Sequence, residues 1–216
     1  MQVISVNMAM PTEVAYQEGM VTTGIFKKPV KGAVRVRSES LEGDAQADLI
    51  NHGGVDKAVY AFSSDHYEYW RTVLGNPGLG PGAFGENLTV SELDESALCI
   101  GDRFSIRDCV LEVSQPRVPC FKLGIALNNT RAPKLFTKSF RTGVYFRVAE
   151  EGVVEAGDQL IKVGEAADSV SVESLFRAYF DKAYAAPEVI FSKALRLEQL
   201  AAEWREMLKK RMLAGS

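Results

Sequence analysis

The chain has 216 residues, of which 46% are hydrophobic, and it carries a formal net charge of −3 at pH 7. A chain of this size can bury a substantial core, as one large domain or as one domain with an appendage. Its lysines and arginines are scattered along the sequence, so a protein that binds the backbone of nucleic acids is not expected.

The termini and the apolar runs give no sign of a membrane or secretory protein. The start, MQVISVNMAM, lacks the features of a signal peptide, and no apolar run approaches the ~18 residues of a spanning helix. We therefore expect a cytoplasmic protein with no membrane partner. Because that compartment keeps thiols reduced, Cys99, Cys109 and Cys120 are expected to be thiols rather than a disulfide framework.

Short strands dominate the first three quarters of the chain. Alternating or β-branched patterns predict strands at 33–37 and 57–62, a hairpin at 104–114 that turns at Arg107, and two or three strands over 142–163. Many short strands with few helices are typical of a sandwich or a closed barrel, so we expect a mainly β fold.

Two helices are predicted among these strands. Residues 63–75 begin with two serines that favour an N-cap and end at Gly75, whereas residues 131–143 carry Pro133 in the first turn.

The composition changes to helical after residue 165. Ser171 is expected to cap one helix and Pro187 to open another. An apolar face of the final helix is marked by Leu197, Leu200, Ala201, Trp204 and Leu208. We predict two domains, a β domain over 1–165 and a small domain of three helices over 168–216 that packs on the first domain or on a partner.

The three cysteines differ in their surroundings. Cys109 shares one side of its predicted strand with apolar residues, and Cys99 lies in an apolar run, so both are expected in the core. Cys120 lies in QPRVPCFKLG, where prolines fix the backbone and Arg117 and Lys122 would favour a thiolate. A buried loop cysteine is the alternative.

A second cluster of polar residues, 42–62, precedes a good strand. Its Gly53-Gly54 turn can direct backbone N–H groups at an anion, and His52, Asp56 and Lys57 surround that turn. We favour a pocket for a polar ligand over a solvated loop.

A third cluster, GPGAFGENLTV at 80–90, contains a formal G-x-G-x-x-G. A dinucleotide fingerprint needs a strand before the glycines and a helix after them, and the order here is reversed. The glycines instead predict a loop whose backbone approaches something closely, with Glu86 and Asn87 presented at the start of a strand. A purely structural turn is the alternative.

A zinc site and a cysteine hydrolase are the other two hypotheses. The spacing of His52, His66 and Cys120 fits no common zinc motif. A cysteine hydrolase would need a base near Cys120, and His52 could serve only if the fold brought it there.

Four stretches together resemble the MOSC family, the domain named after the C-terminal part of molybdenum cofactor sulfurase, and in particular its small YiiM-like branch. They are GDAQADLINHGGVDKAVYAF, FGENLTVSELDE, CIGDRFSIRDCVLEVSQPRVPCFKLG and TGVYFRVAEEGVVEAGD. The resemblance implies a MOSC-type β-barrel followed by a three-helix domain, and binding of molybdenum cofactor (molybdopterin). It also implies two-electron reduction of small N-hydroxylated compounds such as hydroxylaminopurines and amidoximes.

The resemblance places the molybdenum ligand at Cys120, where a soft thiolate suits the metal. The cofactor also carries a phosphate, which we assign to Arg117, Lys57 and the Gly53-Gly54 turn. The polar pterin edges could be read by Asp56, Asn87, Glu86 or His52.

A catalytic acid and an electron source complete the expectation. His52, Asp56 and Glu86 are candidates to provide the proton as the N–O bond breaks. Because the chain shows neither a nucleotide fingerprint nor enough cysteines for an iron–sulfur cluster, electrons are expected from an external reductase. The alternative function is a carrier of molybdenum cofactor or sulfur without turnover of its own; the sequence leaves the oligomeric state open.

Overall fold

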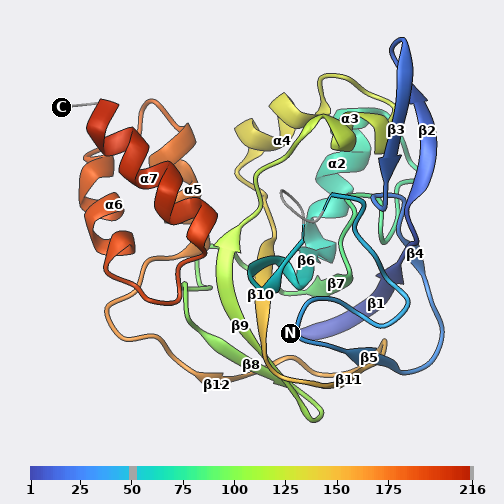
Figure 1. Ribbon diagram of the computed structural model, residues 1–216, viewed down its shortest axis with the longest axis horizontal. Helices are drawn as coiled ribbons and strands as arrows, with labels where there is room; N and C mark the ends of the chain where they lie inside the picture. Colours follow the sequence, from blue (N-terminus) through green and yellow to red (C-terminus); the bar gives the residue numbers. More distant parts are fainter. Residues whose placement is uncertain (49–52, 215–216) are drawn as a thin grey trace.

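An eight-stranded curled sheet forms the centre of the computed structural model, which describes residues 1–48 and 53–214 (Figure 1). In spatial order its strands are β12 (Ile161–Gly164), β8 (Arg103–Ile106), β9 (Cys109–Pro116), β10 (Val144–Glu150), β6 (Val59–Ser63), β7 (Leu88–Ser91), β1 (Gln2–Met8) and β4 (Lys28–Pro29). Neighbouring strands are antiparallel except β6 and β7, which run parallel. The mainly β fold class is confirmed, and the sheet takes the form of a half-barrel.

Two small ribbons flank the sheet. β2 (Thr12–Tyr16) and β3 (Gly19–Thr23) form a hairpin that extends at the upper right of Figure 1. β5 (Val34–Val36) pairs with β11 (Gly152–Val154), which joins two segments more than a hundred residues apart in sequence.

The β8–β9 hairpin contributes apolar side chains to the core. It turns at Arg107, as predicted, with Ile106 paired to Cys109. Alternate residues of β9 face the core, so Cys109, Leu111 and Val113 are all at most 1% exposed.

An aromatic cluster lies beneath three helices at one end of the sheet: α2 (Tyr67–Leu74), α3 (Phe121–Ala126) and α4 (Ala132–Ser139). It contains Phe62 from β6, Trp70 from α2, Phe84 from a loop and Phe136 from α4. The Phe62 and Phe84 rings stack with centroids 4.4 Å apart. Two 3₁₀ turns, η1 (Val55–Lys57) and η2 (Ser64–His66), flank β6.

Three further helices, α5 (Val172–Phe180), α6 (Pro187–Leu195) and α7 (Ala202–Ala214), gather beside the end of β9 (Figure 1). Phe176 and Trp204 belong to the same contiguous core as the sheet residues. The Trp204 Nε1–H donates to the Pro116 carbonyl oxygen at 3.1 Å, and the Ala201 N–H donates to the Ser114 carbonyl oxygen at the same distance. The helical segment is therefore joined to the sheet by packing and by hydrogen bonds, while its division into a separate domain stays a prediction.

Most local signals for the helices are confirmed, with three differences. Gly75 ends α2 in the left-handed conformation, the Ser171 hydroxyl accepts from the Ser174 N–H, and Pro187 opens α6. Ser63 occupies the N-cap position of the 3₁₀ turn η2, but its side chain forms no capping hydrogen bond, and His66 rather than a serine precedes α2.

The other two differences concern where helices end and begin. The chain leaves α4 early, at Phe140, whose φ of 58° breaks the helical path. The final helix begins at Ala202, so Leu197, Leu200 and Ala201 precede it rather than forming its face. Leu200 and Ala201 are nevertheless buried, and Trp204 and Leu208 form the buried side of α7.

Within the described residues, no helix combines the length and the apolar character that crossing a membrane requires.

Candidate functional site

Cys120 lies between the end of β9 and the start of α3, and it is half-buried. The rigid segment 116–119 carries the chain out of the sheet before the cysteine, because two of its residues are prolines. Three neighbouring hollows all have Cys120 in their walls. The thiol is therefore neither sealed in the core nor fully exposed to solvent.

We call the hollow with the most lining residues of these three the main cavity; it encloses about 570 Å³, part of it open to solvent. Residues from six segments of the chain meet there, including three cations: Thr23, Gly24, Ile25, Lys27, Gln46, Ala47, Asp48, Tyr60, Gly85, Asn87, Arg117, Val118, Cys120, Lys122 and Tyr145. This wall combines a thiol, positive charge and amide groups, which suits a ligand with an anionic part.

Arg117 is a buried cation of the cavity, at 6% exposure. Its Nη1 donates to the Phe84 carbonyl oxygen at 2.6 Å and to the Tyr60 hydroxyl at 3.3 Å. The guanidinium also lies over the Tyr60 ring, 4.7 Å from the centroid. Burial acts to lower the pKa of Arg117, but Tyr60, Tyr145 and Cys120 raise it, so the side chain stays charged beside the thiol.

A second cation, Lys27, comes from the segment that follows the β2–β3 hairpin. Both its Nζ distances to the Asp44 carboxylate oxygens are 2.5 Å, and both side chains are 2% exposed. Burial lowers the pKa of Lys27, and Asp44 opposes that shift. The Asp44 carboxylate also accepts from the Asn87 Nδ2–H at 2.9 Å and from the Ala9 N–H at 2.9 Å. The buried charges are thus paired and hydrogen-bonded.

Lys122 and Asn87, both predicted from the sequence, line the same cavity as Cys120 and Arg117. The Lys122 Nζ lies 4.0 Å from an Asp48 carboxylate oxygen. The Asn87 Oδ1 accepts from the Tyr60 N–H at 3.2 Å, which fixes the amide at the start of β7. Four of the predicted site residues are therefore brought together.

The glycine-rich loop approaches another part of the backbone closely, as its sequence indicates. Gly82 and Gly85 have φ of 85° and 75°, and a Cβ at Gly82 would lie 2.4 Å from the Lys27 carbonyl oxygen. Glu86, at the end of this loop, is fully buried and does not line the cavity. Its carboxylate accepts from the Tyr67 hydroxyl, the Gly82 and Phe84 N–H groups and the Thr89 hydroxyl, so it organises the loop.

The residues of the Gly53-Gly54 region fall outside the main cavity. Asp56 accepts from Arg147 at 2.9 Å and 2.6 Å and from the Ala202 N–H at 3.0 Å. Lys57 forms an ion pair with Glu203 of α7 and borders a different hollow beside Cys120. Gly53 and Gly54 line neither space.

One predicted residue, His52, lies outside the described residues. Its roles as a pterin contact or as a proton donor stay predictions.

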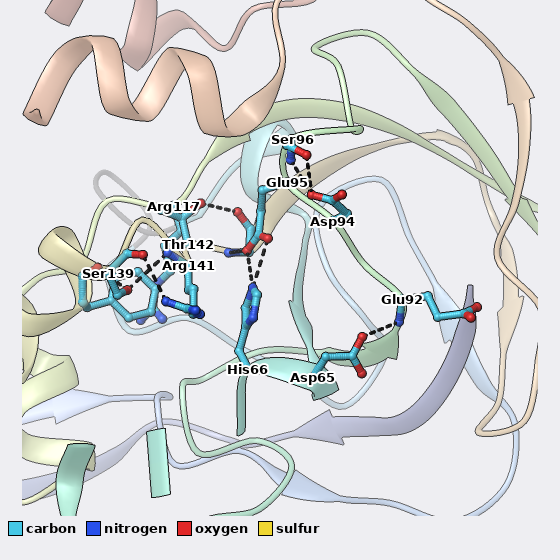
Figure 2. Close-up of polar contacts among 12 residues, drawn as sticks. Asp65, His66, Glu92, Asp94, Glu95, Ser96, Arg117, Ser139, Arg141 and Thr142 are labelled. Carbon is cyan, nitrogen blue, oxygen red and sulfur yellow. Dashed lines mark hydrogen bonds and ion pairs between the residues drawn. The ribbon is translucent and has the colours of Figure 1, made fainter. Parts of the chain in front are cut away.

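The second histidine is engaged by a carboxylate. Figure 2 shows His66 directed at Glu95, and the His66 Nε2 lies 3.0 Å from each carboxylate oxygen. Glu95 also accepts from the Gly143 N–H at 2.8 Å. Across residues 1–48 and 53–214, no group of three or more His, Cys, Asp and Glu side chains is arranged to hold a metal ion.

The other two cysteines have the surroundings expected of structural thiols. Cys109 is fully buried, and burial raises the pKa of its thiol to about 12. Cys99 is half-buried, and burial together with Asp102 raises its pKa as well. The core position predicted for Cys109 is confirmed, whereas Cys99 lies at the edge of the core.

Three residues of the site were missed from the sequence: Lys27, Tyr145 and Glu203. Tyr145 lines both the main cavity and the hollow that contains Glu203. Burial raises the pKa of Tyr145, so its hydroxyl keeps its proton at neutral pH. No local pattern marks these residues, since each reaches the site through contacts between distant parts of the chain.

The chain is similar to known proteins in sequence and in structure. Residues 48–161 match the family model described as the MOSC domain. The uncharacterized protein YflK of Bacillus subtilis is 41% identical over 211 residues, which cover 97% of this chain and 93% of YflK.

A solved structure shows the same architecture. The crystal structure of YiiM from Geobacillus stearothermophilus superimposes with a TM-score of 0.80 and 33% identity, and the match covers 98% of each chain. A protein of Gibberella moniliformis named as a reductase is 37% identical over 145 residues, which are 66% of this chain and 26% of that protein.

Proposed function

Because the chain belongs to the MOSC domain family, we propose that it is an oxidoreductase that holds a molybdenum cofactor at Cys120 and reduces N-hydroxylated compounds. Amidoximes and hydroxylaminopurines are the substrate classes. The observation that carries the proposal is the half-buried thiol of Cys120 in the wall of a cavity that also contains the buried charge of Arg117.

The groups around the cavity fit such a cofactor. A thiolate is a soft ligand that suits molybdenum, and an attached phosphate needs cations and hydrogen-bond donors. Cys120, Arg117 and Lys122 supply the thiol and two cations, and Lys27 and Asn87 line the same cavity. When bound, the cofactor would supply a centre able to take up and release two electrons.

The chain's own residues would prepare the thiol for this role. A cysteine binds metal as a thiolate, so Cys120 must lose its proton. The charge of Arg117 acts on Cys120, and Lys122 lines the same cavity, so both favour the ionised form. Asp56 is occupied by Arg147, and Glu86 by the glycine loop. Tyr60 and Tyr145 both place a protonated hydroxyl in the wall of the cavity that contains Cys120.

The overall reaction requires electrons and protons from outside the substrate. An amidoxime accepts two electrons and two protons; the N–O bond breaks, the oxygen leaves as water, and an amidine remains. We propose an external reductase as the electron donor, because three cysteines are too few for the four thiolates of an iron–sulfur cluster.

Activity measurements test the proposal. The protein is expressed where molybdenum cofactor is made, and benzamidoxime is supplied with a chemical reductant. We expect benzamidine to form, with loss of turnover in Cys120→Ala and retention in the matched Cys109→Ala. Molybdenum bound without any turnover would instead favour a cofactor carrier.

A further inference from the structure

A second hollow also has Cys120 in its wall, between the end of β9 and the start of α7. It encloses about 650 Å³, part of it open to solvent, and is lined by Lys57, Gln115, Val118, Pro119, Cys120, Tyr145 and Glu203. Val118, Cys120 and Tyr145 also line the main cavity, so the two spaces meet at the thiol.

The position of Glu203 is fixed by its neighbours in the chain. The Ala202 N–H donates to the Asp56 carboxylate at 3.0 Å, and the Trp204 Nε1–H donates to the Pro116 carbonyl oxygen at 3.1 Å. Trp204 itself is fully buried. Because the residues on both sides of Glu203 are held on the sheet, its backbone is fixed at the wall of the hollow.

Glu203 and Gln115, two residues with hydrogen-bond acceptors, line this hollow. Glu203 forms an ion pair with Lys57, but its side chain remains 48% exposed. Gln115 is 2% exposed, and its Oε1 has no hydrogen-bond partner among the described residues. A buried carbonyl oxygen without a donor carries a free-energy cost that a ligand N–H group would relieve.

We propose that this hollow is the substrate subsite and that it selects compounds with adjacent N–H donors, such as amidoximes, amidines and aminopurines. Glu203 and Gln115 accept hydrogen bonds from the substrate, while Cys120 marks the side where the cofactor lies. This inference rests on the proposed function. It assigns Glu203 of the C-terminal helical segment to substrate recognition, although that residue is 83 positions from Cys120 in the sequence.

The charge of the product adds a reason for a carboxylate here. An amidine takes up a proton at neutral pH and becomes an amidinium cation with parallel N–H groups. A carboxylate binds such a fork through charge-assisted hydrogen bonds. Glu203 would therefore bind the cationic product more strongly than an uncharged molecule of the same shape.

Calorimetric titration of the cofactor-free protein with benzamidine tests the subsite. We expect Glu203→Gln to weaken binding about five- to tenfold, a range set by one charge-assisted hydrogen bond at a half-exposed position. Glu206→Gln is the matched control, since Glu206 lies on the same helix and forms an exposed ion pair with Lys209, three residues along it. Uncharged benzyl alcohol should bind wild type and Glu203→Gln equally.

Lys57→Met separates recognition from a merely structural ion pair. If Glu203 recognises the ligand, removing its competing partner should strengthen benzamidine binding. Weaker binding in Lys57→Met, or equal binding in Glu203→Gln and Glu206→Gln, would overturn the inference. Thermal unfolding of each variant establishes that it is folded at the temperature of the titration.

The titration requires no turnover, so its result is independent of the reductase assay. Benzamidine binding that depends on Glu203, with no reduction of benzamidoxime by the loaded protein, would leave the subsite standing and overturn the proposed function. Reduction of benzamidoxime with an unchanged KM in Glu203→Gln would support the proposed function and overturn the subsite.

Discussion

The ammonium group of Lys27 lies 2.5 Å from both carboxylate oxygens of Asp44, and both side chains are 2% exposed. The pair joins the segment after the β2–β3 hairpin to the loop that precedes η1. It also holds a cation in the wall of the main cavity.

Removing one member of this pair should destabilise the fold strongly. We expect Lys27→Met to lower the free energy of unfolding by about 3–5 kcal/mol, because the Asp44 carboxylate remains buried without its counter-ion. Lys28→Met is the matched control at the exposed neighbouring position, with an expected change within about 0.5 kcal/mol. Urea unfolding measures both, and equal values for the two variants would contradict the importance of the buried pair.

The three cysteines should differ in their reaction with iodoacetamide. In the folded, cofactor-free protein at neutral pH, we expect Cys120 to be alkylated first, because it is accessible from three hollows and lies near Arg117. Cys109 should react only after unfolding, since it is fully buried. Peptide mass spectrometry over time gives the order, and early labelling of Cys109 would show that this part of the core opens.

Lys122→Met should slow the labelling of Cys120. The substitution removes a cation from the cavity wall, so a smaller fraction of the thiol should be ionised. We expect a rate about two- to fivefold lower, a modest loss for a single partly screened charge. Lys134→Met, an exposed lysine on α4, is the control; an identical loss in both variants would point to a general change of charge.

The burial of Cys109 should make the free energy of unfolding decrease at alkaline pH. Burial raises its pKa from 9.0 to about 12, so the unfolded chain releases this proton first as the pH rises. The fold therefore loses stability above pH 9.0. The loss due to Cys109 grows by about 1 kcal/mol between about pH 9 and pH 10. The free energy of unfolding of Cys109→Ala should fall less steeply over this range by that amount. Parallel curves for the variant and wild type would refute the shielding of the thiol.

Asp56 should hold α7 on the sheet. Its carboxylate accepts from Arg147 and from the Ala202 N–H at the start of the helix. We expect Asp56→Ala to cost about 1–3 kcal/mol and to speed amide hydrogen exchange in α7 more than in β9. Asp168→Ala, which loses an exposed pair with Lys193, provides the comparison. A uniform increase of exchange over the whole chain would mean that Asp56 has no specific role at this junction.

Local patterns predict a good part of this fold, because caps and turns depend on neighbouring residues. Gly75, Ser171 and Pro187 mark helix boundaries that the structure confirms. The α3 helix after Cys120 is not predicted from the sequence, because its six residues are too few to show an apolar period.

The site is less predictable because distant segments form it. Arg117, Cys120 and Lys122 are neighbours in sequence, so one motif predicts that they lie close together. Lys27 gives no such signal, because the adjacent Lys28 is identical in type and only the fold buries one of them. Glu203 reaches Cys120 only through the packing of α7 on the end of β9.

The molybdenum content of the purified protein tests the role of Cys120 most directly. The wild type and the variants Cys120→Ala, Cys109→Ala and Cys99→Ala are expressed where the cofactor is made and analysed for metals. We expect about one molybdenum per chain in wild type and in the Cys109 and Cys99 variants, since one thiolate ligand binds one metal centre, and its loss in Cys120→Ala. Molybdenum retained in Cys120→Ala, or none bound by wild type, would contradict the assignment of this thiol as the ligand.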